Sequence, residues 1–425
     1  MTRHLLRLVW NRKRSNLLIA IEILLSFIVL TAVGTVAVFY VDNYRKPLGF
    51  DVENIWTVAL EMNEEGRTSV TEQSDGEAAP PQAAAAARER QARRALVEQL
   101  LLTLRDMPEV EAVAGATVTP YSDNTWTSDI EVGGRRYRYG ASAGTDDLAR
   151  VLGLRVTRGR WFTSEDDAAA WRPIVINDRL AREMFPGKDP VGQFVDETRP
   201  GDTAPDPANR MRVVGVITDY RKAGEYAAPE NFVFNRARLH DEKSEAEPVR
   251  DLVIRVKPGT AADFEARAVA RLRSAAPDWS FQAEPLPQSR ESALRLWLAP
   301  LAAAAIVSLF LLVMVAMGLS GVLWLHVTQR TREIGLRRAK GATVVNIRRQ
   351  LVGEVMLLTA VATAVGLAIV VQFPVLEVFS AVSPFVYGVS LAISFACIFL
   401  LTAACAWVPA RMASVIQPAD ALRYE

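Results

Sequence analysis

Four long apolar segments constrain this chain more than any other feature of its 425 residues. They run over residues 17–41, 298–325, 355–373 and 386–408. Each approaches or exceeds the roughly 20 residues that an α-helix needs to cross a bilayer. A buried core helix can imitate one such segment, but four of them predict an integral membrane protein with four transmembrane helices.

The first segment also has features of a cleaved signal peptide, because it follows Arg12, Lys13 and Arg14 and contains small residues at Ala32 and Gly34. The apolar core of a signal peptide is only about 7–15 residues long, and this segment continues well beyond that length. We therefore expect an uncleaved transmembrane anchor.

Lysine and arginine predict the orientation of the spans. They occur before the first span, between the second and third, and after the fourth, whereas residues 374–385 contain none. Basic loops stay on the cytoplasmic side, so both termini should be cytoplasmic and the long segment between the first two spans should lie outside. The expected order is a cytoplasmic N-terminus (1–16), transmembrane helix 1 (17–41), an exported domain (42–297), transmembrane helix 2 (298–325), a cytoplasmic hairpin (326–354), transmembrane helix 3 (355–373), a short exported loop (374–385), transmembrane helix 4 (386–408) and a cytoplasmic tail (409–425).

The cysteines exclude a disulfide from the exported segment, because Cys397 and Cys405 both lie in the fourth apolar segment. At about 250 residues the exported segment is long enough to fold on its own hydrophobic core. The three histidines are scattered, without the spacing of metal ligands. The sequence therefore predicts no metal site.

The exported segment contains two strand–helix–strand patterns. The first covers residues 55–61, 83–105 and 110–119, and the second covers 252–257, 261–275 and 279–286. Two such units around a middle block predict an α+β domain, with a ferredoxin-like porter lobe and an inserted second lobe. In the middle block we expect strands over 126–132, 136–143, 173–176, 211–217 and 231–234, helices over 146–152 and 177–185, and a loop over 196–209. A flexible insert is expected over 63–82, within the first unit.

The stretch TREIGLRRAKGATVVNIRRQLVGE (331–354) concentrates positive charge between the second and third spans. Gly341 suits the C-cap of one helix and Thr343 the N-cap of the next. The hairpin would then present Ile334 and Leu336 among basic residues. Such a surface fits the groove of a partner protein, although basic loops often serve only to set topology. Nucleic acid is disfavoured, because the patch lacks interleaved aromatic residues.

Motifs of catalysis are not found in the sequence. The only Gly-Lys pair, Gly187-Lys188, is followed by Asp189, so no P-loop is formed. There is also no Gly-x-Ser-x-Gly or His-Glu-x-x-His pattern. Glu22 is the single carboxylate that lies well inside an apolar segment. A proton relay needs several carboxylates, so one does not suggest such a relay. We expect Glu22 to reach the interface or to pair with an arginine near Arg348; the alternative is an ion or drug contact inside the membrane.

Several stretches together resemble the FtsX-like/MacB-type ABC permease family. TREIGLRRAKGAT and the closing PADALRYE resemble its permease domain, and GRWFTSEDD, IVINDRLAREMFPGKDPVGQ and MRVVGVITDY resemble its MacB-like periplasmic core domain. The order of spans is also the same. The glycine-poor first span and the Ala/Pro-rich insert depart from the family pattern. We expect PVGQ and Gly215 to serve packing and turns rather than substrate contact.

The resemblance implies a non-catalytic permease subunit in a bacterial inner membrane, with residues 42–297 forming a periplasmic domain and residues 374–385 a periplasmic loop. MacB carries a fused ATPase, so ATP and Mg would here be bound by a separate ABC ATPase subunit, and no cofactor is expected in this chain. A second permease copy, identical or paralogous, is implied, with membrane lipid around it and a periplasmic adaptor and outer-membrane channel as further partners. The cargo would be a peptide, a macrolide-like compound or another amphiphile; lipoprotein release and an FtsX-type scaffold that regulates a hydrolase are the alternatives. The residues expected to couple to the ATPase are Arg332, Glu333, Ile334, Gly335, Leu336, Arg337, Arg338, Gly341 and Ala342.

Overall fold

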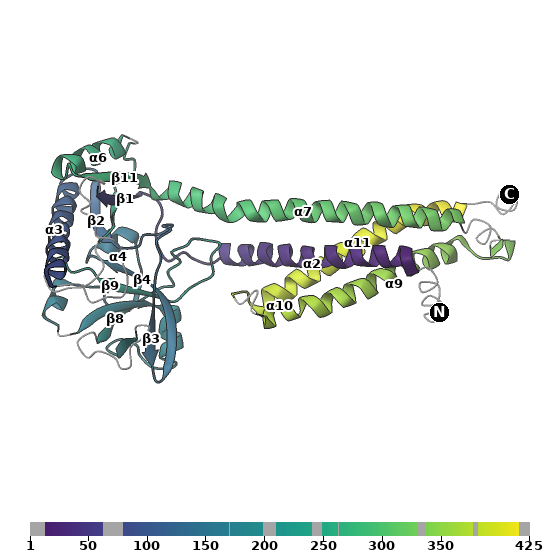
Figure 1. Cartoon of the computed structure of the whole chain (residues 1–425), viewed down its shortest axis with the longest axis horizontal. Coiled ribbons are helices and arrows are strands. Elements are labelled where there is room, and N and C mark those ends of the chain that lie inside the picture. Colours follow the sequence, from purple (N-terminus) through teal and green to yellow (C-terminus); the bar gives the residue numbers. More distant parts are fainter. Residues whose placement is uncertain are drawn as a thin grey trace. The chain divides into compact units, whose positions relative to one another are not determined.

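The computed structural model of the chain describes residues 13–62, 80–169, 171–198, 210–239, 249–261, 263–329, 336–337, 339–376 and 381–415. The chain divides into two compact units. We call Asn43–Leu296 the core domain, and Met1–Asp42 together with Trp297–Glu425 the membrane unit. Figure 1 labels many of the helices and strands of both.

The core domain contains the two predicted strand–helix–strand units. The first consists of β1 (Ile55–Met62), α3 (Pro80–Arg105) and β2 (Val110–Ala116), and the second of β10 (Asp251–Val256), α6 (Phe264–Ala275) and β11 (Trp279–Pro285). Their strands pair in the order β11-β1-β10-β2, and every pairing is antiparallel. The two units therefore interleave as in a ferredoxin-like fold, which confirms the predicted first lobe.

The middle block forms the second lobe. Its elements are β3 (Trp126–Val132), β4 (Arg135–Gly144), α4 (Leu148–Leu152), β5 (Val156–Gly159), the 3-10 helix η2 (Ser164–Ala168), β6 (Arg172–Asn177), α5 (Asp178–Met184), β7 (Phe194–Thr198), β8 (Met211–Ile217) and β9 (Phe232–Arg236). The sheet continues from β2 in the order β4-β3-β7-β8-β6-β9, and β9 pairs back with β4. These pairings close the strands of the inserted lobe into a barrel-like sheet. The short strand β5 pairs with β8 at its side.

Side-chain alternation in the strands creates two cores on the two faces of the ferredoxin-like sheet. Val113 of β2 faces the core that α3 and α6 cover, whereas its neighbours Ala112 and Ala114 face the core that contains α4. Phe264 and Leu272 place an apolar stripe of α6 in the first of these cores, at helical spacing. The sheet is thus covered on both faces.

The second of these cores also holds residues of the inserted lobe. Leu148 and Leu152 of α4 lie in the same buried cluster as Phe232 and Phe234 of β9. The two lobes therefore pack on one shared cluster within the core domain.

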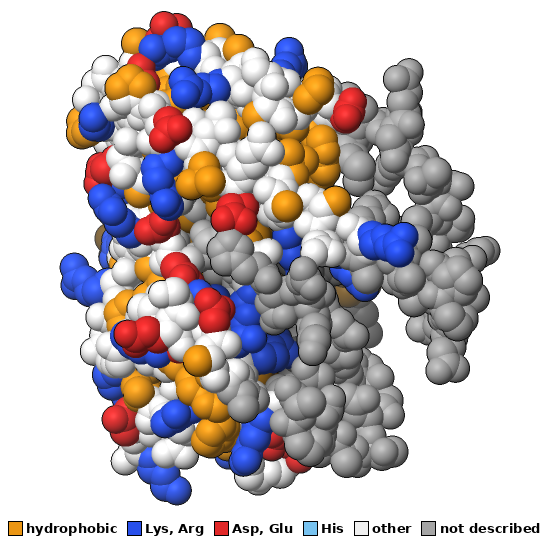
Figure 2. Space-filling view, turned by 90° about the vertical axis from the view of Figure 1, so that its left-hand side faces the viewer, with side chains coloured by type: hydrophobic (Ala, Val, Ile, Leu, Met, Phe, Trp, Pro, Cys, Tyr) orange, Lys and Arg blue, Asp and Glu red, His pale blue; other side chains and the backbone are white. Residues whose placement is uncertain are grey.

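The face of the core domain shown in Figure 2 is mixed in charge. Figure 2 shows basic and acidic side chains interspersed over the visible face, with apolar patches between them. A surface of this kind differs from the single-sign basic stripe of a nucleic-acid interface.

Some sequence expectations for the core domain are wrong. Asp196–Thr198 belong to β7, which pairs with β3, instead of a loop. Pro80–Gln82 begin α3 instead of ending the insert. The remaining residues of both segments, 63–79 and 199–209, lie outside the described residues. The strands β5 and β7 were not predicted, because four or five residues carry too little periodicity.

The membrane unit holds the predicted spans. Four helical stretches are long and apolar enough to cross a membrane: Leu17–Tyr44, Leu286–Gln329, Val344–Pro374 and Pro384–Trp407. They belong to the helices α2 (Lys13–Tyr44), α7 (Leu286–Gln329), α9 (Val344–Val370), α10 (Gln372–Val375) and α11 (Pro384–Val415). Since α7 starts at Leu286, the stretch before the predicted second span is also helical.

Small residues allow the transmembrane helices to pack closely around α2. A Cβ at Gly366 of α9 would lie 2.6 Å from the ring of Phe27, and one at Gly34 would touch Ser394 of α11 at 3.7 Å. Ile23 and Phe27 of α2 are fully buried among residues of α7, α9 and α11. Close contact at small residues is the usual way in which helices associate in lipid.

Candidate functional site

The predicted coupling hairpin is described in part. Arg332, Glu333, Ile334, Gly335 and Arg338 lie outside the described residues. Leu336, Arg337, Gly341 and Ala342 are described, and Leu336 is half exposed. The coupling role of all nine residues stays a prediction.

The turn of the hairpin has a defined geometry. Gly341 has φ +92°, a left-handed conformation that favours glycine. The amide of Ala342 donates to the carbonyl of Arg337 at 3.0 Å. A left-handed glycine followed by this long-range bond is the Schellman motif that ends helices, so Gly341 acts as the predicted C-cap.

The next helix begins at once. The hydroxyl of Thr343 accepts a hydrogen bond from the amide of Asn346 at 3.3 Å, which is the predicted N-cap of α9. Ile347 and Leu351 of α9 pack against Val327 of α7. The described ends of α7 and α9 are therefore in contact near the turn.

A second candidate site lies inside the core domain, in the loop 219–230 between β8 and β9, which we call the junction loop. Its Arg221 is 1% exposed, although arginine is rarely buried. The guanidinium donates to the carbonyls of Asn43 (2.8 Å) and Lys46 (3.1 Å), and also to those of Glu225 and Ala227 in the loop itself. Burial lowers the pKa of Arg221. Arg221 thus ties the last turn of α2 to the junction loop.

The same loop also holds the start of α7. The side chain of Glu225 is 4% exposed. Its carboxylate accepts a hydrogen bond from the Nε of Arg290 at 2.5 Å. The hydroxyl of Tyr121 lies 3.4 Å from both oxygens of Glu225. Hydrogen bonding to Glu225 raises the pKa of Arg290. Leu286, four residues earlier, is fully buried in the cluster that α4 and β9 share.

The ends of α2 and α7 within the core domain therefore contact one loop, Asn43 through Arg221 and Arg290 through Glu225. Sequence reasoning missed this site. The partners are separated by 178 and 65 residues, so spacing gave no signal. The charged run after the buried strand β8 was the only local hint.

The expected packing role of the two glycine motifs is confirmed. Gly192 of PVGQ has φ +86°, and its amide donates to the carbonyl of Val213 at 2.8 Å. A Cβ on Gly215 would collide with the backbone of Arg160. Gly192 therefore serves a turn with a left-handed backbone, and Gly215 allows the backbone of Arg160 to approach β8 closely.

Glu22 lies beside a glycine of a neighbouring helix. A Cβ added to Gly318 of α7 would lie 2.7 Å from the Oε2 of Glu22. The expected pair with an arginine near Arg348 is not among the ion pairs of the described residues. Gly318 leaves the space that this carboxylate occupies.

Models of two known protein families match this chain. The model of the MacB-like periplasmic core domain matches residues 23–272, and the model of the FtsX-like permease C-terminal matches residues 305–418. The fold and the order of its parts are thus those of an ABC-type permease. The chain belongs to the family of proteins with a MacB-like periplasmic core domain, because that model covers more than half of it.

Known relatives share a modest part of the sequence. A macrolide export ATP-binding/permease protein MacB of Aeromonas hydrophila is 25% identical over 322 residues, which cover 72% of this chain and 47% of the relative. The MacB protein of Nitrosomonas europaea is 30% identical over 286 residues, 64% of this chain and 40% of that protein. The chain spans about half the length of the curated relatives it matches. The periplasmic region of MacB from Actinobacillus actinomycetemcomitans aligns with a TM-score of 0.38 at 14% identity, covering 57% of this chain and 94% of that structure.

Proposed function

We propose that the chain is the membrane subunit of an ABC-type export system, in which a separate ATPase subunit hydrolyses ATP and drives movement of the core domain. The hairpin around Gly341 would dock on that ATPase at the cytoplasmic face of a bacterial inner membrane. Both termini would be cytoplasmic and the core domain periplasmic. A second permease copy would complete the assembly.

The observation that supports this proposal most directly is the capped turn between α7 and α9. Its geometry is set by the left-handed Gly341 and the Thr343 cap, and the flanking helices contact each other at Val327 and Ile347. A turn held in this way can transmit a push to two transmembrane helices. Within the core domain, the junction loop contacts Asn43 of α2 and Arg290 of α7. We propose that movement of these two helices reaches the core domain through this loop.

The proposed cargo is a peptide, a macrolide-like compound or another amphiphile. The names of the relatives, macrolide export proteins, support export as the process. Release of lipoproteins and regulation of a periplasmic hydrolase are the alternatives. Co-purification of a periplasmic adaptor supports export, cross-linking to acylated proteins supports lipoprotein release, and capture of a cell-wall hydrolase supports the scaffold.

Docking is tested by substitution in the hairpin. Ile334→Asp, Glu333→Arg and Leu336→Asp should abolish co-purification of an ABC ATPase from native membranes, as measured by quantitative mass spectrometry. Leu102→Asp is the matched control, because Leu102 is 53% exposed on α3 of the core domain, close to the 50% of Leu336. It should capture the ATPase as the wild type does. Capture at the wild-type level by all three hairpin variants would refute the docking role.

A further inference from the structure

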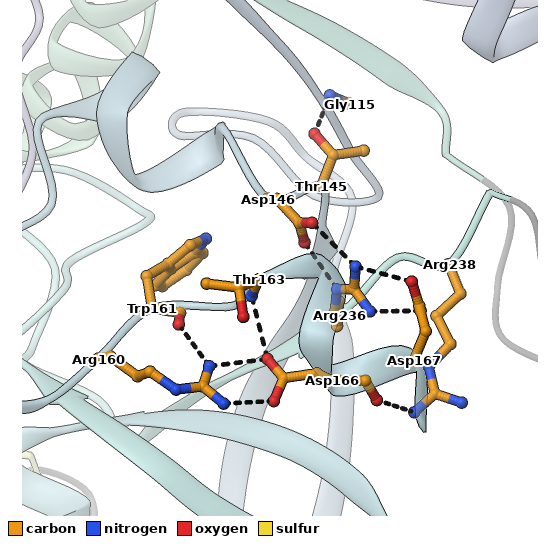
Figure 3. Close-up of polar contacts among 10 residues, drawn as sticks. All are labelled: Gly115, Thr145, Asp146, Arg160, Trp161, Thr163, Asp166, Asp167, Arg236 and Arg238. Atoms are coloured by element: carbon orange, nitrogen blue, oxygen red, sulfur yellow. Dashed lines mark hydrogen bonds and ion pairs between the residues drawn. The ribbon is translucent and has the colours of Figure 1, made fainter. Parts of the chain in front are cut away.

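Two buried charges of the core domain show what an ionised side chain needs away from water. Arg236 has a side chain that is 7% exposed, and it lies between Asp146 and Asp167 (Figure 3). Asp166 is 2% exposed and accepts two hydrogen bonds from Arg160, at 2.8 and 2.5 Å (Figure 3). A charge that is taken out of water needs such a partner, because the cost of its desolvation is otherwise not offset.

Glu22 of α2 lies away from water without such a partner. It is five residues inside the apolar span Leu17–Tyr44, which is about 8 Å from the end of that span. Within the part of the chain that the structure describes, no basic side chain pairs with its carboxylate and no donor hydrogen-bonds to it. Ionisable side chains at this depth are costly and mark binding sites or ion pathways. The carboxylate of Glu22 is therefore available to a ligand.

Glu22 also lies at the border between the packed side and the exposed side of α2. Ile23 is fully buried among the other helices, whereas Leu18 and Leu25 are 71% and 53% exposed. With 3.6 residues per turn, Glu22 falls between these two sides, and it is itself partly exposed. A molecule beside α2 can therefore reach the carboxylate without entering the packed interior of the membrane unit.

The adjoining side of α7 has the same arrangement. A Cβ added to Gly318 would lie 2.7 Å from the Oε2 of Glu22. Gly318 falls between the buried Leu319 and two exposed methionines, Met314 (45%) and Met317 (67%). Methionine side chains are flexible and polarisable, and surfaces that contain them accept apolar ligands of varied shape. An apolar body attached to a group at Glu22 would have these methionines beside it.

A second, independent observation is the hydroxyl of Ser26, one turn after Glu22 on the same face of α2. Ser26 is 2% exposed, and its Oγ has no hydrogen-bond partner among the described residues. The hydroxyls of Thr31 and Thr35 instead donate to the carbonyl four residues earlier, at 2.8 and 2.7 Å. A buried hydroxyl without a partner is unfavourable. Its oxygen can accept a hydrogen bond from an ammonium group that also contacts Glu22.

We propose that Glu22 and Ser26 bind the ammonium group of a lipophilic amine that enters from the surrounding lipid, with its apolar body against Met314 and Met317. The carboxylate and the ammonium neutralise each other at a depth where a single charge is costly. The apolar surroundings favour a lipophilic amine over a hydrated inorganic cation. The assignment names a class of cargo for the proposed export function, and its biological role rests on that function. Binding itself needs no ATPase.

The test uses the full chain in nanodiscs of phosphatidylcholine and phosphatidylglycerol, without ATPase. The probe is dodecylamine with a diazirine near the amine, and labelled peptides are identified by mass spectrometry. Labelling should fall on residues 18–26 of α2 and 314–321 of α7. Unlabelled dodecylamine should compete with the probe. Dodecanol and dodecanoate should compete at least tenfold less well, because they have the same apolar chain without a cation.

A lipid headgroup can carry the same amine chemistry, so the experiment is repeated with phosphatidylethanolamine in place of phosphatidylcholine. The amine of this lipid lies at the membrane surface, whereas Glu22 lies about 8 Å inside the apolar span. Labelling by the probe should therefore be unchanged. Loss of labelling in phosphatidylethanolamine would assign the site to a lipid headgroup and overturn the binding of a free amine.

Variants test the two polar groups. Glu22→Gln keeps the shape and removes the charge, and should weaken the probe at least tenfold, whereas Ser26→Ala removes one neutral hydrogen bond and should weaken it about threefold. Ser308→Ala is the matched control for the hydroxyl. Ser308 of α7 is 6% exposed and also lacks a hydrogen-bond partner among the described residues, but it lies ten residues, about 15 Å, from Gly318. Glu291→Gln removes a carboxylate of the core domain that is 64% exposed. Neither control should change the affinity.

Three further results would overturn the assignment: labelling outside these parts of α2 and α7, equal competition by dodecanol, or wild-type affinity of the Glu22→Gln variant. If a second copy of the chain covers this side of α2 and α7, the probe does not reach Glu22 and the first of these results is obtained. None of them concerns the hairpin, so failure here would leave the docking experiment untouched. Conversely, loss of ATPase docking would leave amine binding at Glu22 unchanged.

Discussion

The ion pair between Glu225 and Arg290 gives the sharpest prediction about the junction loop. Arg290→Ala leaves the carboxylate of Glu225, which is 4% exposed, without its cation. Removing one partner of a buried pair costs about 3–5 kcal/mol, whereas an exposed pair contributes about 0–1 kcal/mol. Arg290 is 34% exposed, and Arg221 and the hydroxyl of Tyr121 still face Glu225. We therefore expect a loss of about 2 kcal/mol in the unfolding free energy of the core domain.

The accompanying double-mutant cycle tests the cause. Glu225→Gln keeps the shape but removes the charge, so Arg290→Ala in that background should cost less than about 1 kcal/mol. The coupling energy is then about 1–1.5 kcal/mol, which is typical of residues in contact. Urea unfolding of the full chain in detergent, followed by tryptophan fluorescence, measures all four states. Additive costs, within about 0.3 kcal/mol, would show that the charge on Glu225 is not what holds Arg290.

The remaining predictions concern three other sites. Asp251→Asn should stabilise the core domain by about 2 kcal/mol at pH 8 and by little at pH 4. Burial raises the pKa of Asp251 from 3.8 to about 6. The stability that its protonated form contributes is therefore complete below pH 3.8 and lost as the pH rises through 6. An equal change in the unfolding free energy at pH 4 and pH 8, measured by urea unfolding, would contradict this. Gly366→Leu should separate α9 from α2, because even a Cβ at this position would lie 2.6 Å from the ring of Phe27. The variant should therefore lower the thermal stability in detergent. Gly353→Leu is the control, because a Cβ there meets open space. Gly341→Ala should cost the hairpin about 1 kcal/mol because its φ is +92°; faster tryptic cleavage there would support this, and an unchanged rate would not.

Periodicity predicted the large elements of the fold well. Long apolar runs gave the spans, and helical stripes such as Phe264 and Leu272 gave α6. The ferredoxin-like lobe followed from two strand–helix–strand patterns. The closure of the second lobe did not, because the pairing of β4 with β9 joins strands about 90 residues apart through register that no local pattern encodes.

The sites were predicted unevenly for a similar reason. Gly341 and Thr343 act locally, through backbone conformation and a cap, and both were found from the sequence. Arg221 and Arg236 act on partners that are distant in the chain. A single arginine in a sequence does not reveal that it is buried, so both sites required the structure.

The orientation of the hairpin tests the account most directly. Cys397 and Cys405 are replaced by alanine, and single cysteines are introduced at Leu336 and, as the control, at Arg135 in the exposed turn region of β4. A membrane-impermeant maleimide is then applied to spheroplasts and to inverted membrane vesicles. We predict that position 336 is labelled only in inverted vesicles and position 135 only in spheroplasts. Labelling of position 336 in intact spheroplasts would contradict a coupling hairpin that receives its energy from a cytoplasmic ATPase.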